Sequence, residues 1–286
     1  MSVEIESGGL AARGAAPGRH ASAALALVTT DPHGLAATGT ARHRAETSHG
    51  GLDLVRELEE VVDRLHDDGP TPHARDGLDA LVASWAEALV RVHRTRLTAL
   101  VPAAPLPWVL VEPLPGWLAD LPADAGPAWA VRAHPAVGRA IGRTRAGWTA
   151  AQWTHGEPTG DAVVVVATGH GPRAELSAPA GRGDPRWDVA TVLDWLAVAL
   201  GPALDPAWRI DPGARFLAAY RDLGGSATPT RAMAVARTVL TAVEWSAQLA
   251  VGRDPQDEEL AWLAGLWTRP LELIGAARSG TAAGTR

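Results

Sequence analysis

The sequence predicts an α+β fold, in which several short strands accompany a larger number of helices. Apolar residues recur at helical spacing between Leu52 and Leu65, which indicates an amphipathic helix. Val163 to Val166 form an uninterrupted apolar run, which is typical of a buried strand. With 286 residues, of which 47% are hydrophobic, the chain has enough apolar content for one large domain or for two lobes that share a core.

In the first part of the chain, periodicity and turn residues predict a hairpin and two helices. Asp31-Pro32-His33-Gly34 is a turn sequence between two apolar segments. A loop that contains Gly69 and Pro70 separates the two helices. In chain order, the predicted elements are strands at 21–30 and 35–44, helices at 52–65 and 76–96, and a short apolar strand at 108–116 that ends at Pro and Gly.

The second part of the chain is predicted to be mainly helical, with one hairpin. The hairpin turns at Gly169-His170-Gly171-Pro172, between the apolar run and a partner strand. The last helix is expected to bend near Pro270, because proline removes a helical hydrogen bond. The predicted elements are a helix at 135–148, strands at 163–167 and 173–177, and helices at 189–200, 214–223, 230–251 and 257–277.

Composition narrows the functional classes. The formal net charge of −6 argues against nucleic-acid binding, and no apolar run reaches the roughly 20 residues that a membrane span needs. The first 20 residues lack the apolar centre of a secretion signal, so a cytoplasmic location is expected. The absence of cysteine excludes disulfides and thiolate metal sites. All 26 basic residues are arginine, so any function that requires a lysine ammonium is excluded.

Two motifs carry the functional information. The first is the turn His155-Gly156-Glu157, and the second is Gly183-Asp184-Pro185-Arg186-Trp187-Asp188. Together they resemble the catalytic core of aminoglycoside-phosphotransferase-like kinases. The resemblance implies a two-lobed, protein-kinase-like fold with a reduced N-lobe that carries inserted helices, at 21–112, and a helical C-lobe at 113–277. Residues 1–20 and 278–286 are expected to be disordered tails.

The positions that carry catalysis in this family hold other residues here. Glu157 stands in place of the catalytic Asp, and Ala162 in place of a metal-binding Asn. Leu176 stands in place of a second metal-binding Asp, although a shift of one residue in the hairpin would bring Glu175 there. The lysine that pairs with nucleotide phosphates in protein kinases has no counterpart. The resemblance therefore implies a pseudokinase, for which no cofactor is expected.

The alternative is an active ATP-dependent phosphotransferase that acts on Ser or Thr of a peptide or on a small molecule. In this alternative Glu157 is the base, while Asp161 and Asp184 bind magnesium with the ATP phosphates. His155 is either a general base or a support of the turn, and the resemblance favours the support. The weakness of the alternative is that three contributors to phosphoryl transfer are missing at once.

A closer resemblance concerns the segment His134-Pro135-Ala136 to Trp148, which precedes the His155 turn. It is similar to the phosphotransferase-like proteins of class V lanthipeptide and thioamitide biosynthesis. That likeness implies two partners, a precursor (leader) peptide and a lyase-type modification subunit. Arg139, Arg143 and Arg145 are candidate peptide-binding residues, and a solvated helix face is the simpler explanation of them. A regulatory protein unconnected with peptides is a third interpretation.

The resemblance also assigns scaffold roles to two aspartates. Asp184 belongs to the Gly-Asp-Pro segment, and Asp188 is expected to accept hydrogen bonds from the backbone of the His155 turn. Such bracing is useful with or without phosphoryl transfer. Replacing Asp188 is therefore expected to destabilise the protein, whereas Glu157→Gln is expected to leave the stability nearly intact.

Overall fold

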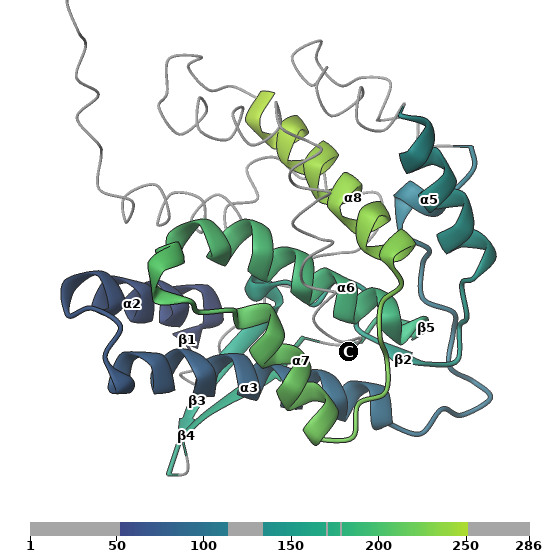
Figure 1. Cartoon of the computed structure of the whole chain (residues 1–286). Coiled ribbons are helices and arrows are strands. Elements are labelled where there is room, and N and C mark those ends of the chain that lie inside the picture. The colour runs from purple at the N-terminus through teal and green to yellow at the C-terminus, as the bar shows by residue number, and fades with distance from the viewer. Residues whose placement is uncertain (1–51, 114–133, 170, 178, 251–286) are drawn as a thin grey trace, which may run out of the picture.

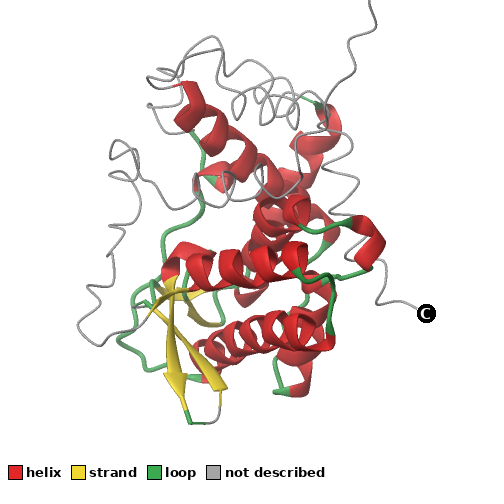
Figure 2. Cartoon of the chain, turned by 90° about the vertical axis from the view of Figure 1, so that its left-hand side faces the viewer, coloured by secondary structure: helices red, strands yellow, loops and turns green. Residues whose placement is uncertain are grey.

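The computed structural model describes residues 52–113, 134–169, 171–177 and 179–250. It shows a mixed helical and β architecture, as the α+β prediction states (Figures 1 and 2). The strands are β1 (Leu52–Asp53), β2 (Gln152–Thr154), β3 (Val163–Thr168), β4 (Gly171–Leu176) and β5 (Gly181–Gly183). The α-helices are α2 (Leu54–Asp67), α3 (Pro72–Arg94), α5 (Pro135–Ala146), α6 (Pro185–Trp195), α7 (Pro212–Asp222) and α8 (Arg231–Ala250).

Several predicted elements fall outside the described residues. They are the tails at 1–20 and 278–286, the hairpin formed by 21–30 and 35–44, and the helix at 257–277. None of the described helices has both the length and the apolar character needed to cross a membrane.

The long helices begin where local capping predicts. Asp53 caps α2 by accepting a hydrogen bond from the Val55 N–H, and Thr71 caps α3 ahead of Pro72. Both helices bury the apolar face that the periodicity marks. The helix predicted at 189–200 starts earlier, at Pro185, and continues as a π-helical turn from Leu196 to Leu200.

The strand predicted at 108–116 is wrong over its first residues, because Trp108–Leu110 is a 3₁₀ turn (η2), and residues 114–116 lie outside the described ones. Val109 and Leu110 are buried against helices, and the Trp108 indole N–H donates to Glu244 on α8 at 2.9 Å. The segment is thus satisfied by packing against α8 instead of by strand pairing.

Two small sheets flank the helices. β1, β3 and β4 form an antiparallel sheet in that order, with Val163 opposite Leu176. Only one face of β3 is fully buried, since Val163 and Val165 are buried and Val164 and Val166 are half-buried. The expectation of a strand buried on both faces is therefore too strong. The second sheet pairs β2 with β5 and positions the His155 turn beside them.

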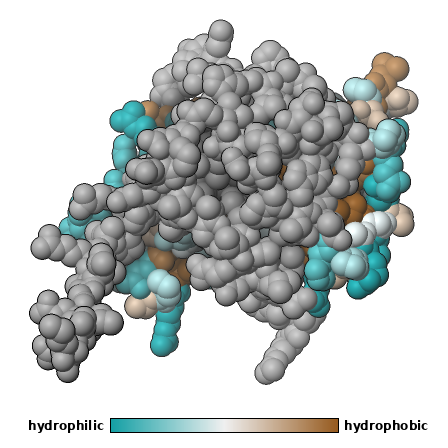
Figure 3. Space-filling model, turned by 90° about the horizontal axis from the view of Figure 1, so that it is seen from above, coloured by the Kyte–Doolittle hydropathy of each residue, from teal (hydrophilic) through white to brown (hydrophobic). Residues whose placement is uncertain are grey.

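Two hydrophobic cores lie on either side of α6, which crosses the middle of the molecule in Figure 1. The first core combines α2, α3, β3, β4, α6 and α7, and the second combines η2, α5, α6 and α8. The lobe boundary expected between residues 112 and 113 does not separate these cores, because the first draws residues from both sides of it. Figure 3 shows the molecule from above, where the described residues visible at the rim are a mixture of hydrophilic and hydrophobic ones.

Candidate functional site

The His155 turn follows β2 and is held by one buried carboxylate. Asp188, on the first turn of α6, accepts hydrogen bonds from the His155 N–H at 2.7 Å and from the Gly156 N–H at 2.9 Å. Gly156 has a φ of 90°, a conformation that glycine adopts without strain. This is the contact that the resemblance implies for Asp188. The turn is therefore fixed to α6 by a carboxylate that is itself 0% exposed.

The same carboxylate continues into a buried network that the sequence did not suggest. His93, near the end of α3, contacts Asp188 Oδ2 through Nε2 at 3.0 Å and the Tyr220 hydroxyl through Nδ1 at 2.7 Å. Burial, assisted by the Asp188 charge and opposed by the backbone of Ala227, raises the pKa of Tyr220 to about 12. The network links the turn to α3, α6 and α7, and its neutral Tyr220 suits a structural role.

One signal in the sequence could have identified His93. It follows Leu89 by four residues, and so lies on the face of the helix that carries Trp85 and Leu89. A histidine on a buried face requires polar partners inside the protein.

Glu157, the residue in place of the catalytic Asp, is held in an ion pair. Arg237 of α8 approaches it with two nitrogens, Nη2 at 2.6 Å from Oε1 and Nη1 at 3.0 Å from Oε2. The Arg237 side chain is 4% exposed and that of Glu157 is 35% exposed. Such a bidentate pair is strong and geometrically specific. The carboxylate of Glu157 is thus already engaged by a buried cation.

A second carboxylate, which the sequence did not suggest, completes this cluster. Asp194 on α6 accepts hydrogen bonds from the hydroxyls of Thr238 and Thr241, both at 2.6 Å, and its Oδ2 lies 3.9 Å from Arg237 Nε. Burial raises the pKa of Asp194, although Arg237 and the two hydroxyls oppose the shift. Burial by itself lowers the pKa of Arg237, but Glu157 and Asp194 outweigh it and hold that pKa above its ordinary value. The cluster joins the turn and α6 to α8.

The two positions at which the resemblance implies metal ligands lie on neighbouring segments of backbone. Leu176 is opposite Val163 in the sheet, and the Ser177 N–H donates to the Ala162 carbonyl at 3.1 Å. Glu175 instead pairs with Arg173 at 3.7 Å, and both side chains are 56% exposed. Neither Ala162 nor Leu176 has a side-chain oxygen, and magnesium requires oxygen ligands.

The acidic residues of the phosphotransferase alternative have other contacts. Asp161 accepts a hydrogen bond from the Thr159 hydroxyl. Asp184 caps α6, pairs with Arg186 at 2.5 Å and accepts from the Thr149 N–H at 3.0 Å. Within the described residues, no group of three or more His, Asp or Glu side chains is arranged to hold a metal ion.

The ring of His155 is buried and bonded to Ser177. Its Nε2 lies 2.7 Å from the Ser177 hydroxyl. Burial lowers the pKa of His155, even though Asp188, Glu157, the backbone of Glu157 and Asp161 all favour the charged form. A neutral imidazole that bridges the turn to the end of β4 fits the support role that the resemblance implies.

The chain has no match in comparisons with family models, curated proteins or solved structures.

The three candidate peptide-binding arginines of α5 differ in their surroundings. Arg145 donates to the Leu110 carbonyl at 2.6 Å and pairs with Glu112 at 2.6 Å, so it fastens α5 to the preceding segment. Arg139 and Arg143 are exposed, one turn apart on the same helix. Only this exposed pair is available to a partner, and Arg145 contributes mainly to the fold.

Proposed function

We propose that this chain is a pseudokinase, a protein-kinase-like scaffold that has kept the frame of the catalytic turn and lost phosphoryl transfer. The observation that carries the proposal is the bidentate pair between Glu157 and the buried Arg237. A general base must reach the proton that it removes, and this carboxylate is instead committed to a buried cation. The contact of Asp188 with the turn supports the kinase-like frame.

The neighbouring positions support the same proposal. Ala162 and Leu176 are adjacent, at the place where the resemblance implies two metal ligands, and both are apolar. Phosphoryl transfer depends on metal ions that neutralise the developing charge. The active phosphotransferase with magnesium and ATP would require a site that these side chains do not supply.

We further propose that the scaffold serves ribosomal peptide modification of the lanthipeptide and thioamitide type. It would bind a precursor peptide, a lyase-type subunit or both. The support for this part is the resemblance of the His134 to Trp148 segment and of the two motifs. The test has two steps: whether the genes beside the gene for this chain encode a short precursor peptide, and whether that peptide binds to the chain when measured by fluorescence anisotropy.

The pseudokinase proposal is tested by thermal unfolding with ATP and magnesium. A ligand present at 100 times its Kd stabilises a folded protein by about 2.7 kcal/mol, which raises the Tm of a domain of this size by roughly 5–10 °C. We expect no metal-dependent shift with millimolar ATP. A shift that requires magnesium, together with ADP release, would overturn the proposal in favour of the active phosphotransferase.

A matched variant sharpens this test. Ala162→Asn combined with Leu176→Asp restores both ligand types at adjacent positions, and Glu157 is left in place. If the kinase-like frame is correct, this variant gains a magnesium-dependent Tm shift with ATP that the parent lacks. Ala162→Asn alone and Leu176→Asp alone, each of which changes the packing but supplies only one of the two ligands, are the controls for altered folding.

A further inference from the structure

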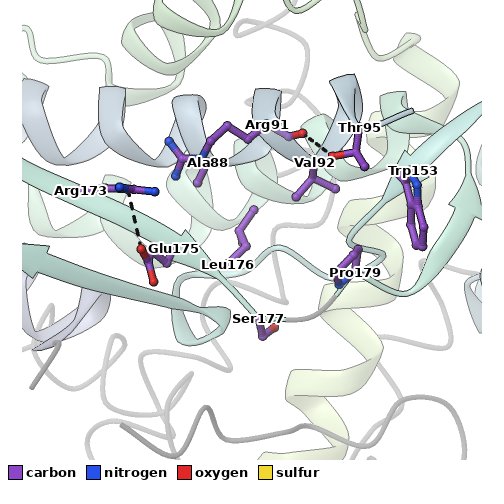
Figure 4. Close-up of a pocket in the computed structure, with 10 residues that line it drawn as sticks. All are labelled: Ala88, Arg91, Val92, Thr95, Trp153, Arg173, Glu175, Leu176, Ser177 and Pro179. Atoms are coloured by element: carbon purple, nitrogen blue, oxygen red, sulfur yellow. Dashed lines mark hydrogen bonds and ion pairs between the residues drawn. The ribbon is translucent and has the colours of Figure 1, made fainter. Parts of the chain in front are cut away.

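A cavity of about 380 Å³ lies between the second half of α3 and the outer edge of β4 (Figure 4). Its volume is within the range of ligand sites in proteins. The residues that line it include Arg91, Val92, Trp153, Arg173, Leu176 and Ser177. A second hollow of about 400 Å³ shares Arg91 and Thr95 with it, so the depression continues along α3.

Two arginines from opposite walls meet at one end of this cavity. Figure 4 shows the guanidinium groups of Arg91, from α3, and Arg173, from β4, lying next to each other. Arg173 has only a 3.7 Å contact with Glu175, and its side chain is 56% exposed. Arg91 pairs with Glu87 at 2.7 Å on the exposed surface. Exposed pairs of this kind are weak, so both cations can exchange their carboxylate partners for an anion while Arg91 Nη2 keeps its bond to the Ala174 carbonyl.

The edge of β4 provides the second half of the site. Arg91 Nη2 donates to the Ala174 carbonyl at 2.6 Å, so this carbonyl points away from β3. Outward-pointing residues alternate along an antiparallel strand, so the backbone groups of Leu176 point the same way. Among the described strands, only β3 pairs with β4. Of the outward residues, Pro172 has no N–H and the Ala174 carbonyl is held by Arg91, so an extended chain could add to this edge through the Ala174 N–H and the backbone groups of Leu176.

We propose that this groove binds an extended acidic peptide that adds to β4 as a further strand. Side chains of a strand alternate between its two faces. One face of the added strand would bring acidic side chains to Arg173 and Arg91, and the other would lay apolar side chains along Val92 and Leu176. The charged residues that line the cavity are two arginines and one glutamate. This local excess of positive charge favours an acidic ligand, although the net charge of the whole chain is −6.

This inference deepens the proposed function and rests on it for the presence of a peptide. It places the peptide on α3 and β4 instead of on the arginines of α5. The test uses the full chain and a fluorescein-labelled peptide of alternating Glu and Val, as long as the six residues of β4. We expect saturable binding by anisotropy at low ionic strength, and at least tenfold weaker binding of the Lys and Val analogue.

Two perturbations test the mode of binding. Arg173→Ala should weaken the affinity about tenfold, which corresponds to the loss of one charge-assisted hydrogen bond. The control is Arg215→Ala, because Arg215 is an exposed arginine on α7 that pairs with Asp79 at 3.2 Å. Methylation of alternate peptide nitrogens should weaken binding by a similar factor, since it removes donors to β4.

Three outcomes would contradict peptide binding in the groove. The first two are an unchanged affinity in Arg173→Ala and equal binding of the methylated peptide. The third is a dimer of the chain that the peptide does not dissociate, because the groove would then bind a second copy of the chain. If Arg143→Ala weakens binding while Arg173→Ala does not, the groove is wrong and the peptide-binding function stands. The ATP experiment decides the pseudokinase proposal independently of all these results.

Discussion

Consecutive residues of one turn are held by two different kinds of chemistry. The backbone of His155 and Gly156 is bound by Asp188, whose remaining contact is His93. The side chain of Glu157 is bound by Arg237, a guanidinium buried on α8. The first region is a network of directed hydrogen bonds, and the second is a cluster of formal charges that includes Asp194.

The difference shows what each region can tolerate. Asp188 is fully buried and accepts hydrogen bonds from two backbone N–H groups, that of buried His155 and that of partly buried Gly156. Glu157 is partly exposed, so solvent can replace some of what its partner provides. The turn thus has a rigid attachment to α6 and a more adaptable one to α8. The four predictions below test this contrast, from the largest expected effect to the smallest.

Asp188→Ala should have the largest effect. It leaves the N–H groups of His155 and Gly156 and the ring of His93 without their acceptor, at a cost of about 4 kcal/mol or more in the free energy of unfolding. Urea denaturation measures this loss. Asp211→Ala is the matched control, because exposed Asp211 also accepts a backbone N–H, as the cap of α7. It should cost only about 1 kcal/mol. Equal losses in the two variants would contradict the special role of Asp188.

Arg237→Met should rank second, with a loss of about 3 kcal/mol, because it leaves the buried Asp194 without a cation. Since the pKa of Asp194 is already raised, removing the opposing arginine raises it further. When the pKa of Asp194 is higher in the folded state than in the unfolded state, the folded state holds the proton over a wider range of pH. The free energy of unfolding should therefore fall as the pH rises from 3.8, the unfolded value, through the folded pKa. Measuring the free energy of unfolding from pH 4 to pH 7 tests this sign.

A second substitution controls for the loss of packing at Arg237. Asp194→Asn, added to Arg237→Met, removes the carboxyl group and should abolish most of the additional pH dependence. A double variant with the same pH profile as Arg237→Met would show that Asp194 is not the titrating group.

The elements that the sequence predicted well are those with local signals. The helical periodicity of Leu52 to Leu65 and the caps at Asp53 and Thr71 depend on neighbours in the chain, and α2 and α3 follow them closely. The prediction of a strand that begins at Trp108 was wrong because the apolar residues of this segment are equally suited to packing on a helix. A short apolar run does not distinguish a buried strand from such a packed turn.

In the candidate site, too, the sequence predicted some contacts and missed others. The contact of Asp188 with the turn was expected from the resemblance of the segment Gly183 to Asp188, which carries every residue of the family's Gly-Asp-Pro-x-Trp-Asp pattern. The partners His93 and Tyr220 are 127 residues apart, and Arg237 is 80 residues from Glu157. Nothing local in the sequence assigns such pairs, because any of the 26 arginines satisfies the charge requirement. Only the packing of α8 on α6 selects Arg237.

Glu157→Gln should have an intermediate effect, and here the structure revises the expectation from sequence. That expectation assumed a carboxylate without a partner, but Glu157 neutralises the buried Arg237. The amide keeps one acceptor oxygen and loses the charge, so we expect a loss of about 1–2 kcal/mol by urea denaturation. Glu87→Gln, which alters the exposed pair with Arg91, should cost at most about 0.5 kcal/mol. If Glu157→Gln is as mild as Glu87→Gln, the ion pair adds little to stability.

His155 should produce the smallest effect, visible only as a dependence on pH. Its folded pKa is lowered by burial, so the unfolded state takes up a proton first as the pH falls below 6.5. Stability from the neutral ring is complete above pH 6.5 and declines below it, with a slope of at most about 1.4 kcal/mol per pH unit.

The measurement compares the wild type with His155→Asn between pH 7.5 and pH 5.5, in the same buffers. Titrations shared by the two proteins cancel in the difference, which leaves the contribution of His155. The stability advantage of the wild type should shrink as the medium becomes acidic, because protonation would bring a charge into the buried contact with Ser177. A difference that stays constant or grows toward pH 5.5 would show that the folded turn accepts a charged imidazole, and the turn would then be less rigid than the Asp188 network implies.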